Sequence, residues 1–166
     1  MSLAQIANQI VAPQKGILAA DESSPTIKKR FDSINAESNE ANRRSYRQML
    51  FTTTEASPYI GGIILFDETL RQSTDLGVPF PKLLTDQGIV PGIKVDKGAK
   101  PLVGAEGETV TEGLDGLRDR LREYYELGAR FTKWRAVIRI GDGIPSRTCI
   151  EANAHALARF AALSQE

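Results

Sequence analysis

Four short hydrophobic stretches recur along the chain, and each ends in or contains a polar residue that a plain core strand would not use. They are residues 16–21 (GILAAD), 60–66 (IGGIILF), 92–96 (GIKVD) and 131–138 (FTKWRAVI). A strand buried on both faces normally reads as an unbroken apolar run. Charges set into such runs must be paired, or must face a cavity that uses them. Helical patterns follow all four stretches, so the chain is predicted to be an α/β protein of successive βα units.

The predicted strands cover residues 16–21, 60–66, 89–96 and 129–140. A short amphipathic helix closed by Pro13 precedes the first strand, and Ser24 is predicted to cap the helix after it, with Pro25 at the first helical position. Ser38 is predicted to start a basic helix. We expect an irregular connection with one short helix over residues 68–87, a long loop after the third strand, a helix over 114–124 and a last helix capped by Ser146.

Composition narrows the class of protein without identifying it. The 166 residues fit one domain, and the 21 basic and 21 acidic side chains balance. This balance gives no reason to expect nucleic acid or an anionic membrane as partner. The single cysteine, Cys149, excludes an internal disulfide and suits a reducing cytosol. With no visible signal peptide and no apolar run long enough for a membrane helix, we expect a cytoplasmic protein.

Side chains alternate along a strand, so every second residue shares a face. Three sets are predicted to face one way: Ile17, Ala19 and Asp21; Gly92, Lys94 and Asp96; Phe131, Lys133 and Arg135. If these faces all point inward, two carboxylates, two ammonium groups and a guanidinium converge on one cavity, which suits a phosphorylated sugar. The turn at residues 23–25 adds hydroxyls and helix N-terminal N–H groups, which together favour anion binding.

Other interpretations of these residues remain open at this point. The charges could form structural ion pairs across the sheet, although burying such a set without use is costly. Lys133 beside Arg135 is a candidate for covalent attack on a carbonyl, because a nearby cation lowers the pKa of an amine. The Arg43, Arg44 and Arg47 cluster is interpreted as a solvated helix face, and contacts of these arginines with a subunit or a loop stay open as the alternative.

Six segments together resemble class I fructose-bisphosphate aldolase, in the order of that family and over nearly the whole chain. They are residues 16–23 (GILAADES), 42–44 (NRR), 61–66 (GGIILF), 92–98 (GIKVDKG), 112–117 (EGLDGL) and 133–135 (KWR). The resemblance implies a (β/α)8 TIM barrel, usually a homotetramer. It also implies reversible cleavage of fructose 1,6-bisphosphate to dihydroxyacetone phosphate and glyceraldehyde 3-phosphate through a lysine Schiff base, with no metal or other cofactor.

The resemblance also assigns roles to residues. It implies that Asp21 takes part in proton transfer and that Lys133 stabilises charge during carbinolamine formation and C–C cleavage. The residues implied to hold substrate oxygens or phosphate are Ser23, Thr26, Arg30, Lys94 and Arg135. Thr26 stands where the family more often has serine, so the hydroxyl is kept.

The resemblance places three parts of the family pattern beyond residue 166. They are a strand with two catalytic glutamates, a later strand with the Schiff-base lysine, and a C-terminal phosphate site with its tail. We therefore expect residues 1–166 to be the N-terminal half of a single barrel domain, because a barrel of this kind takes about 250 residues and eight strands. By this resemblance the imine-forming lysine is not Lys133.

Three alternatives to the N-terminal half of an aldolase barrel remain open. The chain could be a non-catalytic phosphosugar-binding or interaction module, or an enzyme that uses Lys133 itself as the imine former with Asp21 as general base. It could also be a polypeptide that does not fold stably by itself. His155 and Cys149 are interpreted as packing or surface residues of the last helix, and no zinc site is expected.

Overall fold

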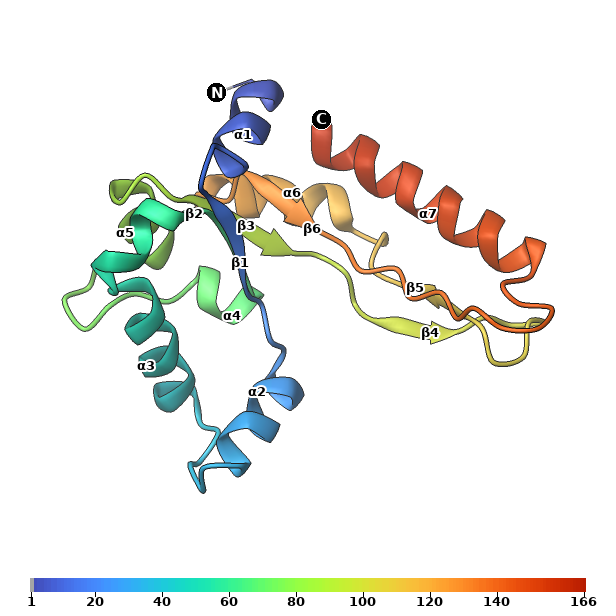
Figure 1. The fold of residues 1–166 in the computed structure, drawn as a ribbon, viewed down its shortest axis with the longest axis horizontal. Coiled ribbons are helices and arrows are strands. Elements are labelled where there is room, and N and C mark those ends of the chain that lie inside the picture. The colour runs from blue at the N-terminus through green and yellow to red at the C-terminus, as the bar shows by residue number, and fades with distance from the viewer. Residues whose placement is uncertain (1) are drawn as a thin grey trace. The chain divides into compact units, whose positions relative to one another are not determined.

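The structure is a computed structural model that describes residues 2–166 (Figure 1). The chain divides into two compact units. The first contains the residues up to Lys94 together with Tyr124–Thr132, and the second contains Val95–Glu123 and Lys133–Glu166.

The secondary structure alternates between short strands and helices, as the sequence predicts. The elements up to the unit boundary are α1 (Leu3–Ile10), β1 (Gly16–Ala20), α2 (Ser24–Asp32), α3 (Glu40–Phe51), the 3-10 helix η1 (Thr54–Tyr59), β2 (Ile60–Leu65), α4 (Asp67–Leu70), α5 (Phe80–Asp86) and β3 (Val90–Lys94). The later elements are β4 (Ala99–Pro101), β5 (Thr109–Thr111), α6 (Leu117–Glu126), β6 (Phe131–Lys133) and α7 (Arg147–Gln165).

The principal sheet has the strand order β1-β2-β3-β6 (Figure 1). Strands β1, β2 and β3 pair in parallel, and their register aligns Ala20 with Leu65 and Leu65 with Ile93. Parallel neighbours joined through helices are the βα units that the alternation of patterns predicts. The α/β prediction with a parallel sheet is therefore confirmed.

The two faces of this sheet are buried to different extents. On one face Ala20, Ile63, Leu65 and Ile93 are each at most 1% exposed. On the opposite face Ile17 is 47% exposed and Ala19 is also exposed. Burying large apolar side chains supplies most of the stabilisation of such a sheet, so the first face is its core. The partly open face is the one on which the predicted charged residues alternate.

The N-terminal part of the open face is filled by Phe131 and helix α1. The Phe131 ring packs against the buried cluster of Ile6, Ile10 and Val90. A Cβ atom on Gly92 would lie 2.3 Å from that ring, so glycine is required for Phe131 to lie across β3. A bulky aromatic side chain and a glycine on neighbouring strands thus complete one layer of packing.

Two sequence predictions about strands and loops are wrong. The fourth strand is only Phe131–Lys133, whereas residues 129–140 were predicted. Beyond Lys133 the carbonyls of Arg135 and Val137 accept hydrogen bonds from threonine hydroxyls at 2.7 Å, so side chains replace a strand partner there. The predicted long loop contains the antiparallel hairpin β4–β5, whose three-residue strands are too short for a periodicity to indicate.

The predicted helix starts are shifted by one residue. Ser23, not Ser24, is the N-cap of α2, so Pro25 lies at the second helical position and not at the first. Asn39, not Ser38, caps α3, and its side chain accepts a hydrogen bond from the Asn42 N–H at 2.8 Å. The polar connection predicted to hold one helix has two, α4 and α5. Ser146 caps α7 as predicted, accepting from the Cys149 N–H.

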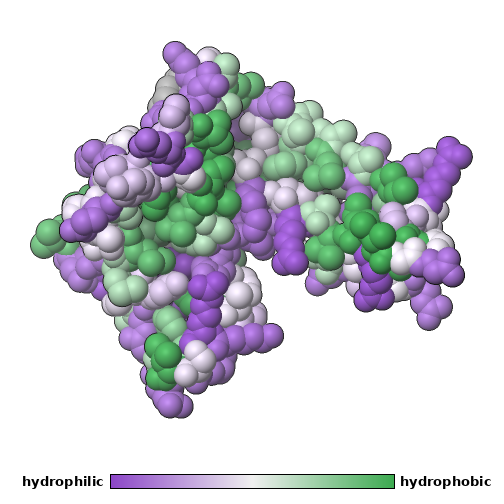
Figure 2. Space-filling model, in the orientation of Figure 1, coloured by the Kyte–Doolittle hydropathy of each residue, from purple (hydrophilic) through white to green (hydrophobic). Residues whose placement is uncertain are grey.

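The second unit is built on the hairpin and helix α7. Trp134 packs on Phe160 of α7 with ring centroids 5.2 Å apart. Asn153, which is buried, donates from Nδ2 to the Thr109 carbonyl at 3.0 Å and so ties α7 to β5. Figure 2 shows hydrophobic surface on the visible face, and exposed apolar side chains of this unit include Ile140 and Ile150. No helix within residues 2–166 is long and apolar enough to cross a membrane.

Candidate active site

Two of the predicted site residues follow the carboxyl ends of parallel strands. Asp21 comes directly after β1 and is 8% exposed, and Lys94 is the last residue of β3 and is half-buried. The register aligns Ala19 with Ile64 and Ile64 with Gly92, so Asp21 and Lys94 each come two residues after the same row. Neighbouring strands lie about 4.8 Å apart, which separates the two backbones by roughly 10 Å. Continued alternation gives both residues the open face of the sheet.

The hydroxyls of Ser23 and Thr26 form a pair at the start of α2. Ser23 Oγ and Thr26 Oγ1 lie 3.1 Å apart. The Thr26 and Ile27 N–H groups both donate to the Ser23 carbonyl at 2.9 Å, which fixes the first turn of the helix. Ile27 is 1% exposed, whereas Thr26 is exposed and Ser23 is half-buried. Hydroxyls at the positive end of a helix suit an anion.

Arg30 lies one helical turn after Thr26 on α2. Residues four apart share a helix face, so the Arg30 side chain extends from the same face as the Thr26 hydroxyl. Its guanidinium pairs with the Glu22 carboxylate at 2.8 Å and donates to the Tyr46 hydroxyl at 3.4 Å. The Arg30 side chain is 58% exposed, so its remaining donors are accessible to solvent. Ser23, Thr26 and Arg30 are thus brought together within the first unit.

The basic cluster on α3 is not a solvated helix face; it makes contacts with connecting segments, which is the alternative that the sequence left open. Arg47 is 2% exposed and pairs with the Glu22 carboxylate, and its second terminal nitrogen donates to the Glu22 carbonyl at 3.2 Å. Arg43 makes a two-point contact with Glu68 at 2.6 and 2.8 Å, and this contact raises the pKa of Arg43. Arg44 pairs with Asp75 at 2.6 Å.

Sequence reasoning missed both Glu22 and Arg47. The available signal was the spacing of Arg47 and Phe51, which are four residues apart and are both buried. Met49 of the same helix is 57% exposed, so hydrophobic side chains alone do not mark the buried side of α3. An arginine on the buried side of a helix must have a partner, and the nearest unassigned carboxylate in the motif of residues 16–23 is Glu22.

The remaining predicted site residues lie in the second unit. The Lys133 carbonyl accepts from the Val95 N–H at 3.1 Å, which extends the pairing of strand ends by one step. The Arg135 N–H donates to Asp96 Oδ2 at 3.3 Å, and Asp96 is 8% exposed. Arg135 itself is exposed. The buried Asp96 carboxylate therefore fixes the backbone at Arg135 and does not face solvent.

Arg120 of α6 anchors the segment that leaves β3. Its terminal nitrogens donate to the Val95 carbonyl at 3.1 Å and to the Gly113 carbonyl at 2.6 Å. A Cβ atom on Gly113 would lie 3.0 Å from the Lys97 N and 3.1 Å from the Val95 carbonyl oxygen, so the two segments run in close contact. Gly113 has φ +131°, which glycine adopts without strain.

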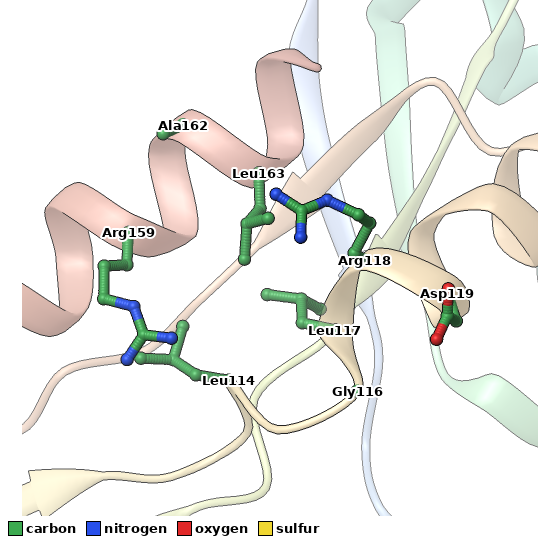
Figure 3. A pocket seen from close by; sticks show the side chains of 8 residues that line it. All are labelled: Leu114, Gly116, Leu117, Arg118, Asp119, Arg159, Ala162 and Leu163. Atoms are coloured by element: carbon green, nitrogen blue, oxygen red, sulfur yellow. The ribbon is translucent and has the colours of Figure 1, made fainter.

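The second unit also contains a cavity of about 480 Å³ between α6 and α7 (Figure 3). Leu114, Leu117 and Leu163 contribute apolar side chains, and Arg118 and Arg159 lie at its margin. Arg118 pairs with Glu166 at 3.0 Å. None of the residues that line this cavity is a predicted site residue.

Cys149 and His155 lie on α7 and contribute no recognisable site. Cys149 is 1% exposed, and burial raises the pKa of its thiol, which lowers the fraction present as the reactive thiolate. His155 is exposed on the helix surface. Among residues 2–166 no three side chains of His, Cys, Asp or Glu come together as a metal-binding group.

Comparison with known proteins gives one consistent family. The model of the glycolytic class I fructose-bisphosphate aldolase family matches residues 2–166. A protein of Xanthomonas campestris pv. campestris named probable fructose-bisphosphate aldolase class 1 is 67% identical over 164 residues, which are 99% of this chain and 49% of that protein. The cytosolic fructose-bisphosphate aldolase 6 of Arabidopsis thaliana is 57% identical over 95% of this chain and 44% of that protein.

A solved structure agrees with these sequences. The fructose-bisphosphate aldolase of Plasmodium falciparum superposes with a TM-score of 0.94 at 49% identity, over 98% of this chain and 47% of that one. The chain spans about half the length of the curated relatives that it matches. Its parallel βα units correspond to that length of the aldolase TIM barrel. The family resemblance noted from six segments is therefore confirmed, and this chain belongs to the class I fructose-bisphosphate aldolase family.

Proposed function

We propose that residues 1–166 form the N-terminal half of a single aldolase barrel domain and supply part of its substrate site. The reaction proposed for the whole enzyme is reversible cleavage of fructose 1,6-bisphosphate to dihydroxyacetone phosphate and glyceraldehyde 3-phosphate. Membership of the family supports this proposal. The observation that carries it is the turn after β1, where buried Asp21 is followed by the Ser23–Thr26 hydroxyl pair and Arg30.

In this proposal the turn binds one phosphate group of the sugar. The hydroxyls of Ser23 and Thr26 donate to phosphate oxygens, and the exposed donors of Arg30 add charge-assisted hydrogen bonds. The positive end of the α2 helix dipole complements the negative charge. Lys94 and Arg135 are assigned to further substrate oxygens. Phosphate binding of this kind fixes the sugar so that its reacting bond lies near the strand ends.

Asp21 and Lys133 are assigned to the chemistry itself. The Asp21 carboxylate is proposed to move a proton at a substrate hydroxyl, for which its place directly after a strand is suited. The Lys133 ammonium is proposed to stabilise negative charge on oxygen as the carbinolamine forms and the C–C bond breaks. The imine itself is assigned to a lysine outside residues 1–166, and no metal or other cofactor is assigned.

The partners and location follow from the same proposal. The substrate is a small sugar phosphate, and the assembly proposed for the whole enzyme is a homotetramer. Neither nucleic acid nor a membrane is proposed as a partner. Relatives from Arabidopsis thaliana and Spinacia oleracea are named cytosolic or cytoplasmic aldolases, which supports a cytoplasmic location.

A hybrid enzyme tests this function directly. We define it as residues 1–166 of this chain joined to the remaining part of the Xanthomonas campestris relative, which matches this chain at 67% identity. Cleavage of fructose 1,6-bisphosphate is followed by the appearance of dihydroxyacetone phosphate, with the unaltered relative as control. Cleavage at a rate within about tenfold of the control is expected. A folded hybrid that binds the sugar bisphosphate without cleaving it would favour a non-catalytic phosphosugar-binding module instead.

A further inference from the structure

The Glu22 carboxylate lies between two arginines that differ in their surroundings. Its Oε1 pairs with Arg30, whose side chain is 58% exposed, at 2.8 Å. Its Oε2 pairs with Arg47, whose side chain is 2% exposed. Glu22 is 9% exposed, so the carboxylate is almost fully removed from water. One acid thus connects a buried cation of α3 to a surface cation of α2.

Arg47 holds the backbone of the turn as well as the side chain. One terminal nitrogen donates to the carboxylate and the other donates to the Glu22 carbonyl at 3.2 Å. The planar guanidinium makes two such contacts at once, which a lysine ammonium cannot reproduce in the same geometry. Glu22 stands between Asp21 and Ser23 in the chain. A contact that fixes Glu22 therefore limits the movement of both neighbours.

Packing around Tyr46 restricts the two arginines further. The Arg47 guanidinium carbon lies 5.4 Å from the centre of the Tyr46 ring, and Arg30 donates to the Tyr46 hydroxyl at 3.4 Å. Phe31 of α2 packs edge-on against the same ring, with centroids 5.9 Å apart. Helices α2 and α3 are therefore joined through Tyr46 at the level of Arg30.

The three charges leave the cluster with a net positive charge. Glu22 contributes one negative charge, and Arg30 and Arg47 contribute one positive charge each. If Arg47 were absent, the Glu22 carboxylate would neutralise Arg30 and draw it away from an anion. With Arg47 present, Glu22 orients Arg30 without cancelling its attraction for phosphate. A buried ion pair is a costly way to stabilise a fold, because both charges lose their hydration.

We infer that Arg47 is a positioning residue that acts through Glu22: it fixes the turn that carries Ser23 and keeps Arg30 beside the Ser23–Thr26 hydroxyl pair for phosphate binding. This inference rests on the proposed function of that turn as a phosphate site. Arg47 itself is buried and does not touch substrate. Its effect is therefore on substrate binding and not on the bond-breaking step.

Steady-state kinetics of the hybrid enzyme test this role. The Arg47→Met substitution is expected to raise KM for fructose 1,6-bisphosphate about tenfold, because a charge-assisted contact is weakened, and to leave kcat within about twofold. The Arg47→Lys substitution is expected to restore only part of the loss. Arg44→Met is the matched control, because Arg44 lies on the same helix but pairs with Asp75. It is expected to leave KM unchanged.

The double variant Arg47→Met/Glu22→Gln separates positioning from simple stability. It removes both buried charges, so its unfolding midpoint is expected to return toward that of the unaltered hybrid. If Arg47 positions the turn, KM stays raised in this variant, because the turn is no longer held and Arg30 is no longer oriented, although Glu22 no longer neutralises Arg30. Recovery of KM together with the midpoint would overturn the inference. If Arg47→Met alone does not fold, the double variant still decides between the two outcomes.

Amide hydrogen exchange gives a readout that does not depend on activity. The Thr26 and Ile27 N–H groups bond to the Ser23 carbonyl and report the order of the turn. In the double variant these two amides are expected to exchange about tenfold faster, while the amides of α3 keep their rates. Unchanged exchange at Thr26 and Ile27 would contradict the inference. A hybrid that does not cleave the sugar bisphosphate contradicts the proposed function, and exchange still tests the positioning role.

Discussion

Gly61 lies directly against the carbonyl oxygen of Ile10. A Cβ atom on Gly61 would be 2.2 Å from that oxygen and 2.7 Å from the carbonyl carbon. Both atoms belong to the backbone, so no side-chain rotation can relieve such a contact. The end of α1 therefore reaches β2 only because residue 61 has no side chain.

We predict that Gly61→Ala lowers the stability of the chain. The substitution forces α1 away from β2, and overpacking of this kind costs about 1–3 kcal/mol. The matched control is Gly16→Ala in β1, where a Cβ atom would meet nothing within 4 Å. Urea unfolding followed by circular dichroism measures both. A Gly61→Ala midpoint equal to that of Gly16→Ala would contradict the close contact.

Strands β1, β2 and β3 are predicted well, because each lies in a short apolar run of the sequence, and their predicted ends lie within two residues of the observed ones. Burial does not explain this accuracy, since β2 and β3 are buried or half-buried throughout whereas three of the five residues of β1 are exposed. The length of strand β6 was overestimated, because the apolar pattern continues past Lys133. There the backbone accepts hydrogen bonds from threonine hydroxyls of β5 and does not pair with a strand. The hairpin β4–β5 was missed because β4 is exposed throughout.

The candidate site shows the same division between local and tertiary information. Period-two alternation gives Lys94 and Asp21 a common face, and the register of β1, β2 and β3 agrees with it. The partnership of Glu22 with Arg47 could not be read from the pattern, because the two residues are 25 positions apart and Glu22 lies in the turn after β1 whereas Arg47 lies on α3. The sequence alone suggests that the charged residues of α3 are solvated. Only the three-dimensional structure shows that the turn after β1 packs beside Arg47.

Glu108 predicts a pH dependence of stability in the second unit. It is 4% exposed, and hydrogen bonds from Ser146 lower the pKa of its carboxyl. A depressed folded pKa means that the folded state favours the ionised acid, so the stabilisation is present above the unfolded pKa of about 4.3 and is lost as the pH falls through the folded pKa. We expect Glu108→Gln to lower the unfolding midpoint at pH 7, and the difference from the unaltered chain to shrink at acidic pH.

Thermal unfolding between pH 3 and pH 7 measures this difference. Glu106→Gln is the matched control, because Glu106 lies two residues earlier in the same loop and is exposed. It is expected to change the midpoint little at any pH. A Glu108→Gln difference that grows as the pH falls would contradict the stated role of the Ser146 hydrogen bonds.

Asp21→Asn is expected to remove most of the activity of the hybrid enzyme. The amide keeps the shape of the side chain but cannot accept a proton, so kcat is expected to fall about 100-fold or more while KM changes little. Asp32→Asn on α2 is the control, because Asp32 is exposed and its carboxylate pairs with Lys28 of the same helix. Equal kcat values for the two variants would remove Asp21 from the proposed chemistry.

The proposed function is tested most directly by identifying the lysine on which the substrate imine forms. The hybrid enzyme is incubated with dihydroxyacetone phosphate and borohydride, which reduces the imine to a stable amine, and the modified lysine is located by peptide mass spectrometry. We predict an adduct on a lysine outside residues 1–166, with Lys133 and Lys94 unmodified. An adduct on Lys133 or Lys94 would contradict it, because this half of the barrel would then form the covalent intermediate itself.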